Sequence, residues 1–161
     1  SIKVDSYPTL LVLDKKGICE YQQNRDPYLM IDYVTDVEPG NYSKGFKQLT
    51  DKDWFFKVHW PTDPNMPGML QVEALVQMSS LAILTLPGNK GRILYLTNVD
   101  KIKFKKKIIP NDKLFLDTKI IKFNHGFAKC KGRGYVNDEL ACEAEFNLIM
   151  PDEIKQFNIK K

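Results

Sequence analysis

The segment from Met69 to Leu86 constrains the fold of this chain more than any other. Pro67-Gly68 precedes it and Pro87-Gly88-Asn89 follows it, so both ends carry signals for the start and stop of a helix. Its length and its many Met, Leu, Gln, Glu and Ala residues favour a helix over a strand. Apolar residues lie on all sides of this helix, and such a helix is buried over most of its surface. We therefore expect a central helix that the rest of the chain surrounds.

The remaining sequence predicts strands that each have one apolar face, together with one short helix over residues 15–23. We expect strands over residues 9–13, 28–35, 42–49, 92–97, 99–107, 114–123, 127–136 and 140–150. Asn137-Asp138, between the last two strands, is typical of a two-residue hairpin turn. The simplest packing wraps an antiparallel sheet around the helix. The sequence thus predicts one α+β domain spanning residues 1–161.

Composition excludes several classes of protein. The chain has 161 residues, which suits one domain, and no apolar run approaches the roughly 18 residues that a membrane helix needs. Residues 1–5 show no apolar core of a signal peptide, so we expect a cytoplasmic protein. Cys19, Cys130 and Cys142 have no metal-ligand spacing and are interpreted as free thiols; no metal is expected. The net charge of +4 is too small to predict nucleic-acid binding.

Glu73 is the least expected residue of the apolar helix. A carboxylate is costly to bury there unless it is paired or used. The helix dipole favours a negative charge only within the first helical turn, and Glu73 lies beyond that turn. Gln77 and Ser80 share its face at helical spacing. Two interpretations stay open on these grounds: a catalytic carboxylate, or a structural one that is hydrogen-bonded to Gln77 or to the backbone.

His59 and Gly68 flank a proline-rich loop that leads into the same helix. A lone histidine is more often structural than catalytic, and the chain contains only two. A glycine at a helix N-terminus, however, exposes an unpaired N–H group at the positive end of the helix, which suits a carbonyl oxygen that gains negative charge. A base, an acid and an oxyanion donor together predict abstraction of a proton next to a carbonyl group.

The stretch from His59 to Gln77 resembles the signature of the 3-hydroxyacyl-acyl carrier protein dehydratases of type II fatty acid synthesis. The family pattern is His-aromatic-Pro-Gly-x-Pro-x-Met-Pro-Gly, followed by Glu-Ala-x-x-Gln. The positions of this chain that match it are His59, Trp60, Pro61, Pro64, Met66, Pro67, Gly68, Glu73, Ala74 and Gln77. Further matches in order are residues 26–32, 38–40, 54–56, 98–104 and 109–112. The resemblance runs from about Ile18 to Met150 and leaves residues 1–14 as an N-terminal extension outside it.

Two positions depart from the family pattern. Thr62 stands where the family usually has Gly, and Asp63 stands where the commoner branch has a second His. The other branch, which also isomerises the double bond, has Asp at the position of Asp63, but it has Asp and not Glu at the helix position. Glu73 therefore favours the branch that only dehydrates.

The resemblance implies a hot-dog fold and a lyase without a cofactor. It implies that the Gly68 N–H binds the thioester carbonyl, that His59 removes the C2 proton, and that Glu73 protonates the departing 3-hydroxyl group of a carrier-bound 3-hydroxyacyl chain. Asp63 and Gln77 are expected to help bind the substrate. In the family, His and Glu of one site come from different subunits, so a homodimer, or a trimer of dimers, is implied.

Two further features fit this interpretation. Lys101, Lys103, Lys105, Lys106 and Lys107 have only Asp100 and Asp112 nearby in sequence, so we expect a locally unbalanced basic stripe. Lys101, Lys103 and Lys105 would share one face of a strand and attract an acidic acyl carrier protein; a merely solvated edge is the alternative. Tyr95 is a candidate gate to the acyl tunnel. Two other functions stay open for the chain: a hot-dog thioesterase, and a non-catalytic acyl-binding or scaffolding homologue.

Overall fold

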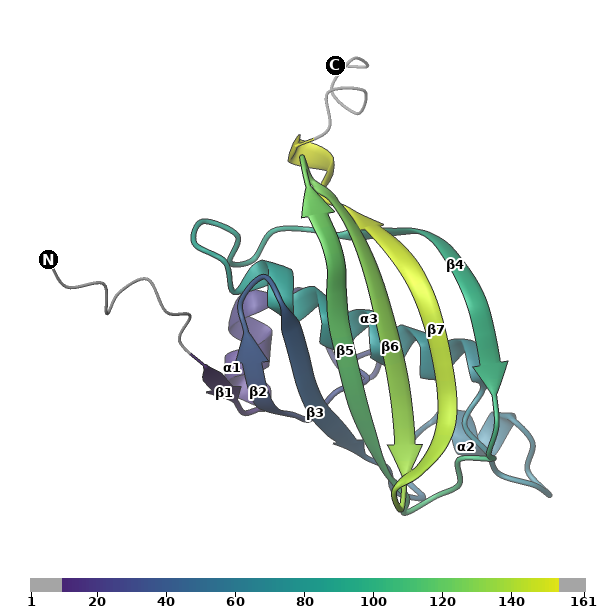
Figure 1. The fold of residues 1–161 in the computed structure, drawn as a ribbon. Helices are drawn as coiled ribbons and strands as arrows, with labels where there is room; N and C mark the ends of the chain where they lie inside the picture. The colour runs from purple at the N-terminus through teal and green to yellow at the C-terminus, as the bar shows by residue number, and fades with distance from the viewer. Residues whose placement is uncertain (1–9, 154–161) are drawn as a thin grey trace, which may run out of the picture.

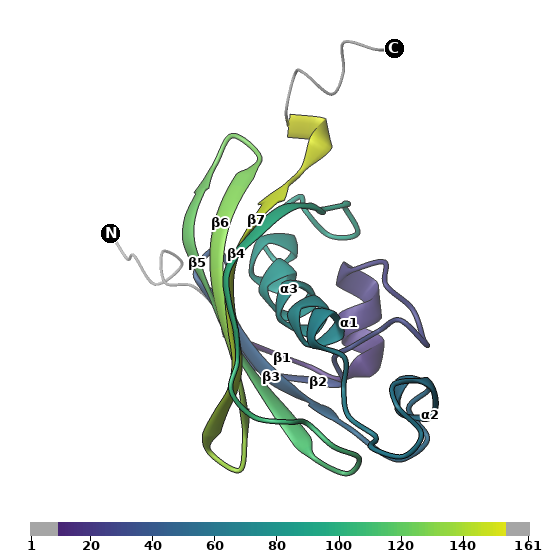
Figure 2. The same cartoon turned by 90° about the vertical axis from the view of Figure 1, so that its right-hand side faces the viewer.

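The helix α3 (Gly68–Leu84) lies against the concave side of a curved sheet in a computed structural model that describes residues 10–153 (Figures 1 and 2). All of its residues from Gln77 to Leu84 are buried. Ser79 and Ser80 within this stretch donate hydrogen bonds to the carbonyl oxygens of Val76 and Gln77, so their hydroxyl groups are satisfied inside the helix. The expected α+β hot-dog arrangement is confirmed.

The sheet has seven antiparallel strands in the order β1-β2-β3-β5-β6-β7-β4. Their bounds are β1 (Leu11–Leu13), β2 (Tyr33–Glu38), β3 (Tyr42–Gln48), β4 (Tyr95–Phe104), β5 (Lys113–Asn124), β6 (Phe127–Val136) and β7 (Glu139–Ile149). The strand that follows α3 in sequence, β4, therefore lies at one edge of the sheet. In β5 and β6 buried and exposed residues alternate, so each of these strands turns one apolar face toward α3. Gly132 lies where the helix packs closely on β6, because a Cβ atom there would stand 3.1 Å from the side chain of Leu75.

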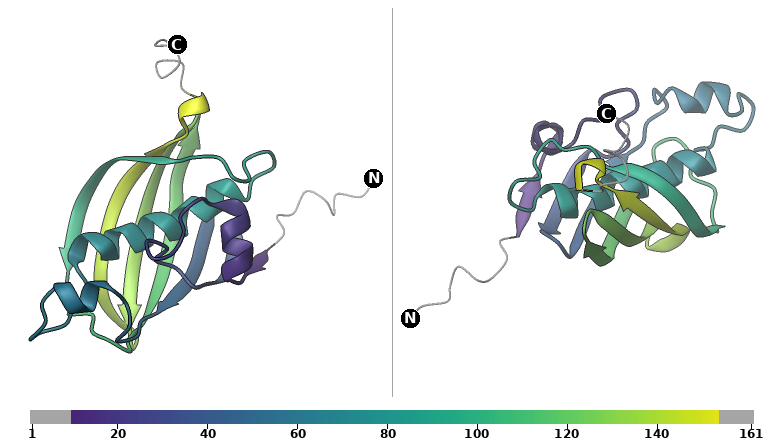
Figure 3. Two further views of the ribbon diagram at one scale, coloured as in Figure 1. Left: turned by 180° about the vertical axis from the view of Figure 1, so that it is seen from behind. Right: turned by 90° about the horizontal axis from the view of Figure 1, so that it is seen from above.

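Two short helices lie on the side of α3 that faces away from the sheet (Figures 2 and 3). In α1 (Lys15–Tyr21), the Asp14 side chain caps the N-terminus by accepting a 2.8 Å hydrogen bond from Gly17 N, and Ile18 is buried. The second helix, α2 (Phe55–Val58), precedes the loop that leads into α3. A 3-10 turn, η2 (Pro151–Glu153), follows β7.

Some predicted boundaries are wrong. Residues 28–32 do not form a strand, and β2 begins at Tyr33. The two strands expected over residues 92–97 and 99–107 are one strand, β4, in which bulges between Leu96 and Asn98 and between Asp100 and Lys103 interrupt the alternation. The strand expected over residues 9–13 is β1, and residue 9 lies outside the described residues. The hairpin turn at Asn137-Asp138 is confirmed, with positive φ at both residues.

The three cysteines are free thiols, and Cys130 and Cys142 are buried. Burial raises the pKa of each of these two thiols to about 12. Both groups therefore remain protonated and unreactive at neutral pH. Among residues 10–153, no helix has the length and apolarity that crossing a bilayer requires.

Candidate active site

Glu73 lies on the second turn of α3 with its carboxylate partly buried. The Nε2 atom of Gln77, one turn further along the helix, donates a 2.7 Å hydrogen bond to its Oε2 atom. Burial raises the pKa of Glu73, and the hydrogen bond from Gln77 offsets part of that rise because it stabilises the ionised form. The net effect favours the protonated carboxyl group, as a general acid requires.

Gln77 is itself held from two sides by the chain segment that leads into β2. The Gln77 amide accepts a 2.7 Å hydrogen bond from Met30 N at its Oε1 atom, and its Nε2 atom donates a 2.9 Å hydrogen bond to the Tyr28 carbonyl oxygen. The side chain is only 2% exposed, so these bonds fix its orientation. The segment around Tyr28 and Met30 thus determines, through Gln77, where Glu73 points.

A cavity of about 300 Å³ opens beside Glu73 and Gln77. Tyr95 and Arg92 line it from the chain that follows α3, and Tyr95 is 53% exposed. Apolar side chains complete part of the wall, namely Val76, Leu84, Leu94 and Leu148. Polar side chains form the rest of the wall, among them Gln22, Gln23, Asn24, Ser80 and Arg92. The cavity therefore combines one partly buried carboxyl group with a mixed polar and apolar lining, which suits an acyl group that carries one polar reacting centre.

His59 stands at the end of α2, where its backbone N–H donates to the carbonyl oxygen of Phe55. Its Nδ1 atom lies 3.1 Å from the carbonyl oxygen of Asn65. A carbonyl oxygen can only accept, so Nδ1 carries the hydrogen and Nε2 keeps a free lone pair. The ring of Trp60 stacks on the imidazole at 4.5 Å. His59 does not line the cavity beside Glu73.

Gly68 is the first residue of α3, and the preceding residue, Pro67, makes no capping hydrogen bond with its side chain. Within residues 10–153, no acceptor is found for the Gly68 N–H, which lies at the positive end of a 17-residue helix. The ring of Phe104 lies directly over this residue: a Cβ atom on Gly68 would stand 2.6 Å from Phe104 Cζ. A side chain at this helix start would therefore require the half-exposed ring of Phe104 or the backbone to move.

Asp63 and the lysine cluster lie elsewhere on the surface. The Lys107 Nζ atom is 2.9 Å from Asp63 Oδ1, so this carboxylate is engaged outside the Glu73 cavity. The prediction that the lysines lack local charge balance is wrong, because β7 pairs with β4 and carries glutamates. The ion pairs are Lys101–Glu145 at 3.7 Å, Lys103–Glu143 at 3.9 Å and Lys106–Glu139 at 3.2 Å.

The regular lysine stripe is also interrupted by the backbone. Lys101 has a φ of 51° and lies in a bulge, and Lys105 lies beyond the last residue of β4. The three lysines therefore do not follow one alternating strand face. Among the described residues, Lys105 is exposed and has no ion pair.

Sequence reasoning did not single out Tyr28, Met30 or Arg92. The negative charge of Glu73 contributes to a raised pKa of Tyr28, after burial, which places the phenol near the carboxylate. The available signal is the match of residues 26–32 to the dehydratase family, but the sequence predicts a strand over residues 28–35. Their backbone instead bonds the side chain of Gln77, a contact 47 residues apart that no local pattern reveals.

Comparison with known proteins identifies the family of this chain. A family model described as a FabA-like domain matches residues 23–145. The 3-hydroxyacyl-acyl-carrier-protein dehydratase FabZ of Bacillus licheniformis is 40% identical over 134 residues, which covers 83% of this chain and 93% of the relative. The dehydratase FabZ of Bacillus subtilis is 37% identical over 139 residues, covering 86% of this chain and 99% of the relative.

Solved structures show the same fold. The dehydratase heterocomplex ApeI:P from Xenorhabdus doucetiae has a TM-score of 0.72 at 12% identity, covering 88% of this chain and 97% of that one. Cj0977, a sigma28-regulated virulence protein from Campylobacter jejuni, has a TM-score of 0.61 at 14% identity, covering 83% and 86% of the two chains. The extent of the family match and the identity to these relatives decide the assignment: the chain belongs to the FabA-like dehydratase family.

Proposed function

We propose that this protein is a lyase that converts 3-hydroxyacyl-acyl carrier protein to trans-2-enoyl-acyl carrier protein in fatty acid or related acyl-chain synthesis. The observation that carries the proposal is the environment of Glu73, a carboxyl group with a raised pKa that Gln77 orients beside a partly apolar cavity. Sequence relatives over more than four-fifths of the chain carry the name of this activity.

The elimination assigns one role to each group. The Gly68 N–H donates a hydrogen bond to the thioester carbonyl oxygen, which gains negative charge, and this makes the C2 proton more acidic. His59 Nε2 takes that proton, the C2–C3 double bond forms, and the C3–O bond breaks. The protonated Glu73 gives its proton to the departing oxygen, which leaves as water. His59 then carries the extra proton and Glu73 is ionised, and proton exchange with water restores both.

We further propose that each complete site combines His59 of one protomer with Glu73 of another. His59 does not line the cavity beside Glu73, so one chain holds the base outside the cavity that contains the acid. The strand β4 lies at the sheet edge and presents an unpaired backbone edge, which suits pairing with the same strand of a second copy. A homodimer is the smallest assembly that supplies complete sites, and a trimer of dimers is compatible with it.

The carrier protein would dock on the basic surface around β4. Lys101 and Lys103 each form an ion pair with a glutamate, whereas Lys105 has no ion pair among the described residues. Acyl carrier proteins are acidic, so an unpaired surface cation is the strongest local attraction for them. Lys105 is therefore the lysine of this cluster on which docking is expected to depend most.

Mixed dimers test the division of the site between chains. His59→Ala and Glu73→Gln homodimers should each lose most turnover while they remain folded. When the two variants are unfolded and refolded together, about a quarter of the sites should become intact, because half of randomly formed dimers are mixed and each holds one site with both groups. Activity that returns only on mixing supports the shared site. Mixed dimers that form without any recovery would show that His59 and Glu73 of the same chain serve one site.

A further inference from the structure

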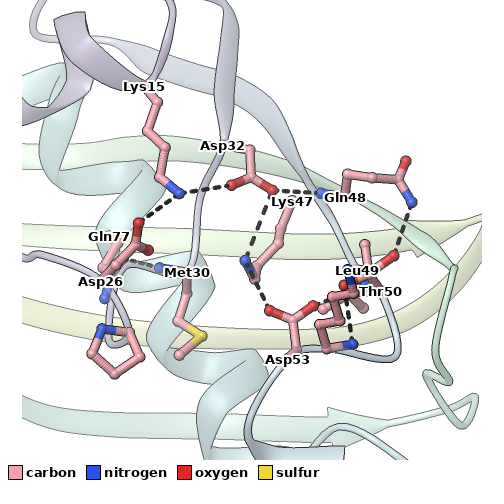
Figure 4. A network of polar contacts seen from close by, with 12 residues as sticks. Lys15, Asp26, Met30, Asp32, Lys47, Gln48, Leu49, Thr50, Asp53 and Gln77 are labelled. Carbon is pink, nitrogen blue, oxygen red and sulfur yellow. Dashed lines mark hydrogen bonds and ion pairs between the residues drawn. The ribbon is translucent and has the colours of Figure 1, made fainter.

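Five charged side chains of alternating sign form a continuous chain behind the candidate site (Figure 4). Lys15 Nζ lies 2.8 Å from Asp26 Oδ2 and 3.7 Å from Asp32 Oδ1. Lys47 Nζ lies 3.8 Å from Asp32 Oδ2 and 3.6 Å from Asp53 Oδ1. The ion pairs connect α1, the segment before β2, the strand β3 and the turn before α2. They therefore join four parts of the chain.

Lys47 is the buried member of this chain. It lies on β3 and is only 6% exposed, so its ammonium group is largely removed from water. Burying a charge is costly unless opposite charges compensate it, and the two carboxylates of Asp32 and Asp53 do so here. An apolar side chain at this position of β3 would avoid that cost. The presence of a buried cation calls for an explanation beyond the packing of the core.

On one side, Lys47 reaches the element that carries His59. Asp53 Oδ2 accepts a 2.8 Å hydrogen bond from Thr50 N, and the Asp53 carbonyl oxygen accepts from Phe56 N at 3.2 Å. The four-residue helix α2 begins two residues after Asp53 and ends immediately before His59. Phe55 and Phe56 bury their rings in the core, and no side chain caps α2. Asp53 and its ion pair with Lys47 add a polar anchor at the start of this helix.

On the other side, Lys47 reaches the segment that orients Glu73. Asp32 Oδ2 accepts a 2.8 Å hydrogen bond from Gln48 N, and Asp32 N donates to the Phe46 carbonyl oxygen at 2.9 Å. Asp32 thereby fixes the end of residues 26–32, whose Tyr28 and Met30 backbone groups hold the Gln77 amide. The Asp26–Lys15 pair fixes the other end of this segment.

The segment of residues 26–32 and the start of α2 also contact each other directly. Trp54 Nε1, at the start of α2, donates a 3.2 Å hydrogen bond to the Pro27 carbonyl oxygen. The segment of residues 26–32 and the helix α2 are therefore linked twice, once through this bond and once through Asp32, Lys47 and Asp53. Displacement of either element is transmitted to the other.

We propose that Lys47 is a positioning residue that holds His59 and Glu73 in their reactive orientations at the same time. The inference rests on the roles proposed above for these two residues. If a site combines His59 of one protomer with Glu73 of another, each Lys47 supports two sites, one through α2 and one through Gln77. A displacement of about 1 Å in a catalytic group can lower the rate about 100-fold, so a modest shift of either element suffices.

Kinetics of Lys47→Met and Lys47→Arg provide the first test. Methionine is one atom shorter than lysine and has no charge, so the two aspartates repel each other and the start of α2 shifts. We expect kcat to fall about 10- to 100-fold with KM changed less than about three-fold, because the groups are displaced but the cavity remains. Lys47→Arg keeps the cation and should recover most of kcat. Lys57→Met, an exposed position on α2 itself, should leave kcat unchanged.

Loss of stability alone must be separated from loss of position. Leu116→Ala removes part of a buried β5 side chain remote in sequence from both catalytic segments, and it serves as a destabilised control assayed well below the melting temperature of every variant. We expect this control to keep kcat within about two-fold of the wild type. If Lys47→Met keeps kcat as well as Leu116→Ala does, or if Lys47→Arg is no better than Lys47→Met, the positioning role is wrong.

An activity-independent measurement completes the test. The chain has two histidines, and His125 is exposed with a φ of 51°, a conformation that asparagine tolerates. In a His125→Asn background, the imidazole proton resonances in the NMR spectrum belong to His59 alone. Lys47→Met should shift or broaden them, and Lys47→Arg should not. Shifted resonances in a protein that does not dehydrate the substrate would refute the proposed function and leave the positioning intact. Unshifted resonances, or shifted ones with an unchanged kcat, would overturn the inference.

Discussion

Gln77 donates a 2.7 Å hydrogen bond from Nε2 to Oε2 of Glu73, one helical turn earlier on α3. The same amide is bound to Met30 N and to the Tyr28 carbonyl oxygen, so its donor and acceptor ends cannot be exchanged. Within the described residues, no donor approaches Glu73 Oε1. One carboxyl oxygen is thus held in place, and the other is free to carry the proton that the reaction needs.

Replacement of Gln77 tests this relationship. Gln77→Met preserves the length of a buried side chain and removes every hydrogen bond of the amide. We expect kcat to fall about ten-fold or more, because Glu73 loses its orientation, and we expect the pKa of Glu73 to rise further, since the bond that lowers it is lost. Steady-state kinetics check the first effect. Gln48→Met, on an exposed position of β3, is the matched control and should retain kcat.

The stability of the protein should depend on pH through Glu73. Burial raises the pKa of Glu73 in the folded state above its value in the unfolded chain. The stabilisation that protonated Glu73 contributes is therefore fully present below the unfolded pKa of about 4.3, and it is lost as pH rises through the higher pKa of the folded state. As pH rises from about 4 to 8, the unfolding free energy of Glu73→Gln should increase relative to that of the wild type. Urea unfolding of both proteins across this range measures the difference, and a constant difference would contradict a raised pKa.

Much of the fold was predictable because the strongest signals are local. The apolar helix with Pro-Gly signals at its ends, the alternating strands β5 to β7 and the Asn137-Asp138 turn all follow from patterns of a few residues. The single strand β4 was predicted as two strands because bulges at Thr97 and near Lys101 break its alternation. Such bulges adjust the pairing of β4 with β7, so the local sequence of β4 alone does not reveal them.

Gly68 offers a test of the helix N-terminus. A methyl group on Gly68 would stand 2.6 Å from Phe104 Cζ, so Gly68→Ala must displace either the ring or the N–H group. We expect at least about a ten-fold loss of kcat, because removal of one oxyanion hydrogen-bond donor lowers kcat about 10²- to 10³-fold and misalignment removes part of that effect. Phe104→Ala removes the obstacle, so the double variant should recover activity relative to Gly68→Ala alone. A purely additive loss in the double variant would show that the clash with Phe104 is not the cause.

Carrier docking makes a different prediction for Lys105. Lys105→Glu should raise KM several-fold for a carrier-bound substrate and weaken the dependence of KM on salt, while kcat stays nearly constant. A small thioester analogue has no acidic carrier and should be unaffected. Lys16→Glu, an exposed charge reversal on α1, is the control. Equal losses on both substrates would indicate that Lys105 supports the fold or the site, and not docking.

The candidate site was predictable in its residues but not in its arrangement. The motif places His59, Gly68 and Glu73 along one stretch of sequence, yet the cavity beside Glu73 is completed by Tyr95 and Arg92 from the chain after α3. The partners of the lysines were also hidden. Lys101 and Lys103 are neutralised by Glu145 and Glu143, which lie about 40 residues away in sequence and become neighbours only through the pairing of β4 with β7. The wall of the cavity and the partners of the lysines both depend on contacts between segments far apart in sequence, which the spacing of residues does not show.

Mass spectrometry of the reaction product tests the central claim most directly. The protein is incubated with acyl carrier proteins that carry 3-hydroxyacyl chains of several lengths, and the intact carriers are weighed. The account predicts carriers lighter by one water that still hold the acyl chain as a trans-2-enoyl thioester, and no such change with His59→Ala or Glu73→Gln. Release of the free 3-hydroxy acid from the carrier, which a thioesterase would cause, or unchanged carriers at every chain length would contradict it.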